Sequence, residues 1–189
     1  TVIFQAQVMR ERFAFSPQRN ADSVRLLAGV DLAPFALIAG RARIGYRKFD
    51  PLGGSLRPFR GLAADVAVTS TVRGRTRLEV ASQRDVNYSF ELEYPYYIQT
   101  GVLVTATPRL TDTWDIQARL GGQRLVYDDS TADLPHRVDR FLLFGAGVGY
   151  RFGRDTRIGM NVDRQRRRSP LQARDFTGYR IGSSVTYGR

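Results

Sequence analysis

The sequence predicts an all-β protein, an antiparallel up-and-down transmembrane β-barrel with about ten strands. Three observations predict it: apolar and polar residues alternate along long segments, the connections alternate in length, and no segment has a helical period. The longest apolar runs are far shorter than the ~20 residues of a membrane helix. The mean hydropathy of −0.31 is compatible with a barrel, because alternating strands average to a polar value.

Each predicted strand has one apolar and one polar face. In chain order, the segments cover residues 2–13, 24–31, 41–47, 62–72, 77–88, 97–107, 114–120, 140–152, 157–163 and 179–187. The first and the sixth are less regular, whereas the others carry apolar residues at most of their alternate positions, as a strand with two different faces does. In these regular segments the apolar face carries, in order, Val24 and Leu26, Ile44 and Tyr46, Val66 and Val68, Leu78 and Val80, Trp114 and Ile116, Leu142 and Phe144, Ile158 and Met160, and Ile181 and Val185.

The connections between these segments alternate between short and long. The short ones cover residues 32–35, 73–74, 111–113 and 153–155, and the long polar ones cover 16–22, 50–58, 91–96, 128–136 and 169–175. Outer-membrane barrels have short turns at one end and long loops at the other, whereas a soluble sandwich has no reason to sort its loops. The sequence therefore predicts one barrel domain, residues 1–189, which is either a whole barrel or the C-terminal portion of a larger one.

The polar face of the predicted strands is repeatedly charged. In a soluble β-protein this face would meet water and the aliphatic face would form the core. Frequent glycines beside the arginines favour the reverse arrangement, with aliphatic side chains toward lipid and charged ones toward an enclosed lumen. The predicted lumen-lining residues are Arg25, Arg41, Arg43, Arg47, Asp65, Arg77, Glu79, Asp85, Asp115, Arg119, Arg157, Asp163 and Arg180. Arginines outnumber acids in this set, so an open lumen is expected to favour anions.

Aromatic residues gather at two levels of the predicted strands. The level near the long loops includes Phe49, Tyr88 and Tyr96, and the level near the short turns includes Trp114 and Tyr150. An amphipathic ring prefers the depth of the lipid headgroups, so the two levels predict two girdles at the bilayer interfaces.

The last predicted strand carries Arg180, Gly182, Val185 and Tyr187, in the order polar-x-Gly-x-x-hydrophobic-x-hydrophobic. This pattern resembles the C-terminal signal by which outer-membrane barrels are recognised for assembly. The resemblance widens to Phe-Leu-Leu-Phe-Gly-Ala-Gly-Val-Gly-Tyr at 141–150 and Asp-Phe-Thr-Gly-Tyr-Arg-Ile-Gly at 175–182. Both runs look like outer-membrane β-barrel porins of Gram-negative bacteria and, more loosely, like a porin family encoded near exopolysaccharide genes. The resemblance implies a location in the bacterial outer membrane, the barrel-assembly machinery as a partner, and transport through a channel or a polysaccharide-associated pore in the cell envelope.

The chain is basic, with 29 Lys+Arg against 18 Asp+Glu and a net charge of +11. Its one dense basic run supplies Arg164, Arg166, Arg167 and Arg168 at the outer end of a predicted strand. Arginine pairs well with phosphate, so this run is a candidate site for lipopolysaccharide, and a solvated loop stem is the equally weighted alternative. Further arginines at similar heights, which could join it, are Arg10, Arg12, Arg84 and Arg124. A nucleic-acid partner is not expected, since the aromatic residues sit at girdle positions rather than in a basic groove.

The residues of common enzyme sites are scarce in the sequence. There is no cysteine, and His136 is the one histidine, so thiolate chemistry, multi-histidine metal sites and a typical nucleophile–histidine arrangement are not expected. Asp128 and Asp129 could hold a cation weakly but are expected to face solvent. No phosphate-binding or dinucleotide-binding glycine motif occurs. The sequence therefore predicts no enzyme, no cofactor and no metal.

Three functions remain open on the sequence. The first is a porin-like channel or polysaccharide-export pore with an Arg-rich lumen, which would pass an anionic solute or a polysaccharide. The second is a narrow, plugged structural barrel that binds partners through its outer loops, because long arginine side chains can fill a barrel of eight to ten strands by pairing with acids. The third is a soluble β-barrel binding protein.

Overall fold

A computed structural model of the chain describes residues 1–32, 37–53, 56–91, 93–127, 137–153 and 155–187. The described part contains ten strands and two short 3-10 helices, η1 (Pro17–Arg19) and η2 (Gln172–Arg174). The strands are β1 (Val2–Glu11), β2 (Ala21–Leu32), β3 (Ile38–Pro51), β4 (Phe59–Val72), β5 (Thr76–Tyr88), β6 (Tyr96–Pro108), β7 (Trp114–Tyr127), β8 (Arg137–Phe152), β9 (Thr156–Arg168) and β10 (Phe176–Tyr187). No helix in the described residues is both long and apolar enough to cross a membrane.

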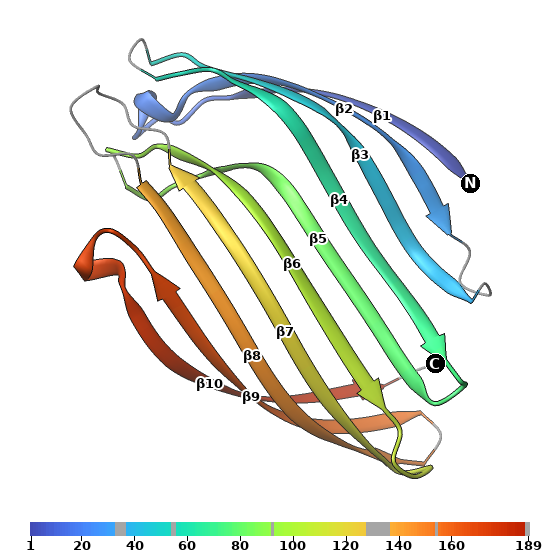
Figure 1. The fold of residues 1–189 in the computed structure, drawn as a ribbon. Coiled ribbons are helices and arrows are strands. Elements are labelled where there is room, and N and C mark those ends of the chain that lie inside the picture. Colours follow the sequence, from blue (N-terminus) through green and yellow to red (C-terminus); the bar gives the residue numbers. More distant parts are fainter. Residues whose placement is uncertain (33–36, 54–55, 92, 128–136, 154, 188–189) are drawn as a thin grey trace.

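The ten strands form one antiparallel sheet whose strand order is the chain order (Figure 1). This confirms the predicted all-β, up-and-down fold and the predicted number of strands. The strand bounds also keep the expected alternation, with short connections at 73–75 and 153–155 and longer ones at 52–58 and 169–175. Most strands extend several residues beyond their predicted bounds, because alternation of apolar and polar residues fades where a strand rises above the apolar band.

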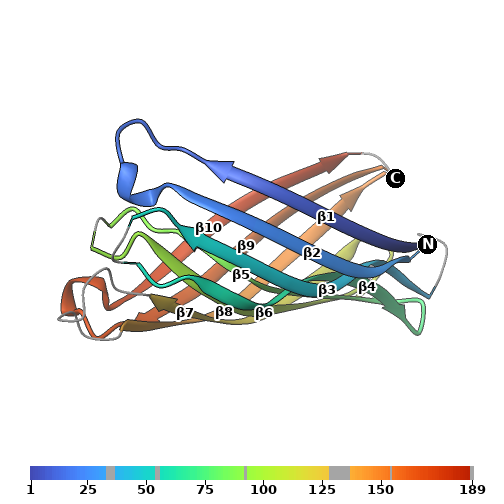
Figure 2. The same cartoon turned by 90° about the horizontal axis from the view of Figure 1, so that it is seen from above.

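The sheet curls along its whole width (Figures 1 and 2). Within the described residues, β1 pairs with β2, β10 pairs with β9, and no ladder joins β1 to β10. Side-chain contacts pass over intervening strands on one face. Arg25 on β2, for example, reaches Asp85 on β5 at 3.2 Å. Such a contact is possible only on the inner side of a curved sheet, since neighbouring strands lie about 4.8 Å apart. The charged face is therefore the concave one.

The aliphatic face is convex and exposed, as the sequence predicted. Phe4, Ile44, Phe144, Met160 and Val185 each leave about half or more of their surface uncovered, and buried residues on this face are few. The described residues contain no large apolar centre of the kind that a soluble sandwich packs between two sheets. A continuous apolar exterior of this extent requires an apolar surrounding.

The sheet divides near the long loops, between β4 and β5. Their ladder runs from Val72 opposite Thr76 to Ala64 opposite Arg84. Beyond it, residues 59–62 of β4 pair with β3, and residues 85–88 of β5 pair with β6. Side chains close this fork: Arg47 donates a hydrogen bond to the Val86 carbonyl at 3.3 Å, and the Val86 amide donates to the Asp85 carboxylate at 2.8 Å. Backbone groups that a neighbouring strand would otherwise satisfy are thus satisfied by charged side chains.

An aromatic cluster fills the same fork and corrects the girdle prediction for Phe49, Tyr88 and Tyr96. Tyr46 and Tyr179, predicted for the same level, are 47% and 71% exposed on the convex face. Phe49 and Tyr96 are about 1% exposed, and they pack with Val86, Tyr88 and Phe59. These rings therefore form an internal core rather than a lipid-facing belt. At the short-turn level, Trp114 and Tyr150 are partly exposed on the convex face, with ring centroids 4.9 Å apart, as a girdle requires.

Candidate functional site

The candidate site is the concave face, where buried aspartates each hold two arginines. Asp85 pairs with Arg25 and Arg47, at 3.2 and 2.7 Å. Asp163 on β9 likewise bridges two arginines on different strands, Arg119 on β7 and Arg180 on β10. The same two-to-one pattern recurs at Asp115, which holds Arg157 and Arg151, and at Asp139, which holds Arg137 and Arg167. Counted without its neighbours, each unit carries one net positive charge, and every aspartate of these units is paired.

Glycines on β8 make room for two of these units. Gly145 lies opposite both Arg119 on β7 and Asp163 on β9, and Gly149 lies opposite Asp115 on β7. A β-carbon at Gly145 would overlap the Asp163 carboxylate, and one at Gly149 would overlap the Arg157 guanidinium. The ion pairs between β7 and β9 therefore cross directly over the backbone of β8. This explains why glycine and arginine alternate so closely in this part of the sequence.

A polar cavity of about 390 Å³ lies on the concave face near the short turns. Residues from β4 to β10 contribute to it, from Thr71 to Thr186, so the curvature of the sheet brings distant strands around a common hollow. Its charged lining comprises Arg75, Arg77, Arg109, Arg151 and Arg157 against Glu79 and Asp115. The excess of guanidinium groups makes this hollow favourable for an anion.

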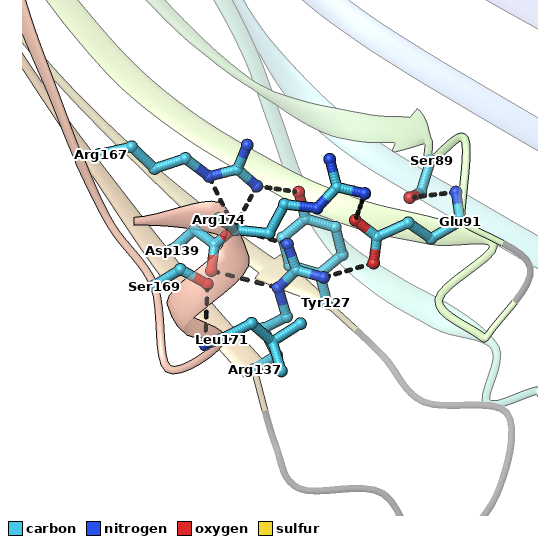
Figure 3. A network of polar contacts seen from close by, with 9 residues as sticks. All are labelled: Ser89, Glu91, Tyr127, Arg137, Asp139, Arg167, Ser169, Leu171 and Arg174. Carbon is cyan, nitrogen blue, oxygen red and sulfur yellow. Dashed lines mark hydrogen bonds and ion pairs between the residues drawn. The ribbon is translucent and has the colours of Figure 1, made fainter. Parts of the chain in front are cut away.

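A second network joins the long loops at the other end (Figure 3). Arg137 is about 1% exposed and pairs with Glu91 at 2.5 Å and with Asp139 at 2.9 Å. Its guanidinium carbon lies 4.1 Å from the centroid of the Tyr127 ring, which adds a cation–π contact. Arg174, next to β10, binds Glu91 from the other side at 2.8 Å. Four chain segments, those that carry Glu91, Tyr127, Arg137 and Arg174, are thereby held together.

All thirteen predicted lumen-lining residues lie on the concave face, in phase with one another across the ladders. Their pairing falls into local pairs, such as Arg41 with Asp65, Arg43 with Asp31, and Arg77 with Glu79, and into the two-arginine units described above. Sequence reasoning missed Arg137 and Asp139, and it placed Arg151 on the polar face of its strand without counting it among the lumen-lining residues. The two-residue period does contain the signal, because Arg137, Asp139 and Gly145 share one phase, but the predicted strand began only at residue 140.

The structure divides the basic run of β9 between the two faces. Arg164, Arg166 and Arg168 lie on the convex face, opposite Phe144, Leu142 and Arg140 of β8. Arg167 lies on the concave face, where it binds Asp139 and Tyr127. The prediction that all four form one lipopolysaccharide site is corrected for Arg167, because a strand turns successive side chains to opposite faces. Arg12 is also committed elsewhere, to Asp22 at 2.7 Å.

The remaining predicted site residues fall into two groups. Arg180, Gly182, Val185 and Tyr187 all lie on β10, with Val185 and Tyr187 exposed on the convex face. The expectations for Asp128, Asp129 and His136 concern residues outside the described part of the chain.

An up-and-down antiparallel sheet with an apolar convex face and an ion-paired concave face defines the class of transmembrane β-barrel proteins. Residues 3–189 match the family described as "Putative beta-barrel porin 2", and the chain belongs to this family. Comparisons with curated proteins and with solved structures gave no significant match.

Proposed function

We propose that this protein is an outer-membrane channel with a water-filled lumen that favours anions. The observation that carries the proposal is the allocation of charge on the concave face, where single buried aspartates hold pairs of arginines. Continuous positive charge along a hollow attracts anions and repels cations. The cavity near the short turns, which Arg75 and Arg109 line without an ion-pair partner among the described residues, is the strongest anion site along this path.

Exposed charged side chains on the same face support a wet interior. The side chains of Arg41 and Arg77 are 51% and 61% exposed although both lie on the concave face. A packed, plugged barrel would have to take these guanidinium groups out of water, and removing a charge from water is costly. In a hydrated lumen they keep their contact with water.

The permeant solute is proposed as a class: a small anion, or an anionic polysaccharide in the export role that the porin resemblance suggests. The same proposal includes an assembly signal on the last strand, which the barrel-assembly machinery recognises. Its residues are Arg180, Gly182, Val185 and Tyr187. We propose no catalytic activity, in keeping with a family described as porins.

The experiment is conductance in a planar bilayer with a threefold KCl gradient. An anion-favouring pore gives a reversal potential with the sign expected for chloride. The magnitude of this potential falls when concave-face arginines are substituted by neutral residues. A reversal potential set by potassium would contradict the proposal.

A plugged barrel is the second candidate, and the loop-end network favours it. Arg137 ties together the loops around Glu91 and Tyr127, and the fork between β4 and β5 is filled with aromatic rings. If these contacts close the outer mouth, the folded and inserted protein gives no conductance. Substitution of Arg137 by glutamine then opens the pore and produces a measurable current.

A further inference from the structure

Exposed arginines gather on the convex face of β7, β8 and β9, at the border of the apolar band. Arg124 lies directly opposite Arg140, and Arg140 lies directly opposite Arg168. Arg164 and Arg166 continue the group along β9. On each strand the arginines follow the apolar band, beyond Leu120 on β7, Leu142 on β8 and Val162 on β9, and Val126 and Val138 lie farther toward the long loops. We call these five residues the convex arginine patch.

The patch has no counter-charge within the described residues. None of its arginines forms an ion pair, and the convex face of β5 to β10 carries no aspartate or glutamate. Like charges directly opposite each other on neighbouring strands destabilise a sheet. An anionic ligand that several guanidinium groups share would remove this repulsion.

An apolar groove of about 360 Å³ begins directly below the patch. Arg124 and Arg140 form its upper edge, and Val102 and Leu142 line it below. Gly122 provides the space between β6 and β8, because the nearest atoms to a β-carbon placed there lie 3.9 Å or more away. The groove thus joins a cationic rim to the apolar band, which matches a ligand with a charged head and a hydrocarbon tail.

We infer that the convex arginine patch binds the phosphorylated headgroup of lipopolysaccharide in the outer leaflet, with one acyl chain in the groove over Gly122. The inference rests on the proposed outer-membrane location, which places the long-loop end toward the outer leaflet. Arginine holds phosphate through paired N–H donors, and phosphate carries the charge that the patch lacks. The proposed site retains Arg164, Arg166 and Arg168 of the site predicted from the sequence. It excludes Arg167 and adds Arg124 and Arg140.

The test measures binding of lipid A to the folded protein in zwitterionic detergent, with calorimetry for affinity and native mass spectrometry for stoichiometry. We expect one lipid A per chain. The double substitution R124Q/R140Q removes both rim arginines and is expected to weaken binding about tenfold or more, because it deletes several charge-assisted hydrogen bonds. The substitution Gly122→Phe keeps every charge but fills the groove, and it is expected to weaken lipid A binding while leaving the protein folded.

The control is R10Q/R60Q, which removes two arginines from the convex face of β1 and β4, away from the groove. We expect its affinity for lipid A to stay within about twofold of the unmodified protein, and a loss equal to that of R124Q/R140Q overturns the site. Wild-type affinity in R124Q/R140Q, or in a folded Gly122→Phe protein, overturns it as well. Competition by inorganic phosphate at the concentrations at which lipid A binds would identify a free-phosphate site and overturn the lipid assignment.

Conductance separates this inference from the proposed function. A wild-type protein that inserts and passes anions, with lipid A binding that R124Q/R140Q does not change, contradicts the lipid site alone. A wild-type protein that binds lipid A through the patch but shows potassium-selective current contradicts the anion channel alone.

Discussion

On β9, Arg167 and Arg168 are neighbours in the sequence but lie on opposite faces of the sheet. Arg167 is bound by Asp139 on the concave face, whereas Arg168 lies opposite Arg140 on the convex face and has no acidic partner in the described residues. The same contrast holds for whole strands. The concave-face arginines of the described strands are all ion-paired, namely Arg25, Arg41, Arg43, Arg47, Arg77, Arg119, Arg137, Arg151, Arg157, Arg167 and Arg180.

The difference teaches that acidic residues, rather than arginines, distinguish the two faces. Arginine occurs on both, but the carboxylates of β5 to β9 lie on the concave face alone. A buried guanidinium needs a carboxylate, because an unpaired buried charge is costly. An exposed guanidinium at a membrane border needs none, provided that the surroundings supply anions.

The largest expected effect comes from removing a concave arginine. Arg157→Gln leaves the Asp115 carboxylate, about 1% exposed, with Arg151 at 3.8 Å as its nearest cation. Breaking a buried pair in this way is expected to destabilise the fold by about 3 kcal/mol. The unfolding midpoint in urea, followed by heat-modifiable migration on a gel, measures the loss. An unchanged midpoint would mean that the concave face is wetter and more loosely paired than the contacts indicate.

The next effect concerns the glycine beneath an ion pair. Gly145→Ala places a methyl group against the Asp163 carboxylate and the Arg119 side chain, and we expect a loss of about 1–3 kcal/mol from strain in a packed site. Gly122→Ala on the convex face, where the nearest atoms are 3.9 Å away, is the matched control and should change stability by less than about 0.5 kcal/mol. Equal effects at the two glycines would contradict the crossing of β8 by the ion pairs.

Selectivity should respond to concave arginines that do not support the fold. R75Q/R109Q removes two cations from the cavity near the short turns without breaking an ion pair in the described residues. We expect the chloride-directed reversal potential to move toward zero while the unfolding midpoint stays constant. R124Q, on the convex face, should leave the reversal potential unchanged. A shift in R124Q of the same size would place its charge in the ion path.

The smallest expected effect has the opposite sign. Arg124→Gln relieves repulsion with Arg140, which lies directly opposite, so the protein should gain about 0.2–1 kcal/mol in zwitterionic detergent. The gain should disappear when lipid A is added, because the wild-type patch is then neutralised. Urea unfolding with and without lipid A measures both values, and a loss of stability in lipid-free detergent would contradict the repulsion.

The sequence predicted the strands and their faces because both follow from a two-residue period. The thirteen charged residues share one face for that reason alone, and Leu142, Phe144 and Met160 share the other. Alternation assigns a side chain to a face but not to a partner, so the pairing of Arg119 with Asp163 over Gly145 required the register of three strands. Arg167 was misassigned because a run of basic residues was considered as a cluster rather than as two alternating sets.

The buried aromatic residues were beyond the reach of the pattern. Phe49 and Tyr96 are at the height of a lipid-facing girdle, and composition alone gives no reason to place them inside. Their burial depends on the separation of β4 from β5, which leaves a space that only large side chains fill. The alternation of apolar and polar residues along a strand carries no information on where two paired strands separate.

That separation gives the two ends of the wall different mechanical properties. Near the short turns, β4 and β5 stay paired through backbone hydrogen bonds down to Val72 and Thr76, and separating them there would mean breaking this ladder. Near the long loops, the segments of β4 and β5 are joined by rings and one arginine. The distance between β4 and β5 at that end can therefore change through a rearrangement of side chains alone, without the loss of a backbone hydrogen bond between these two strands.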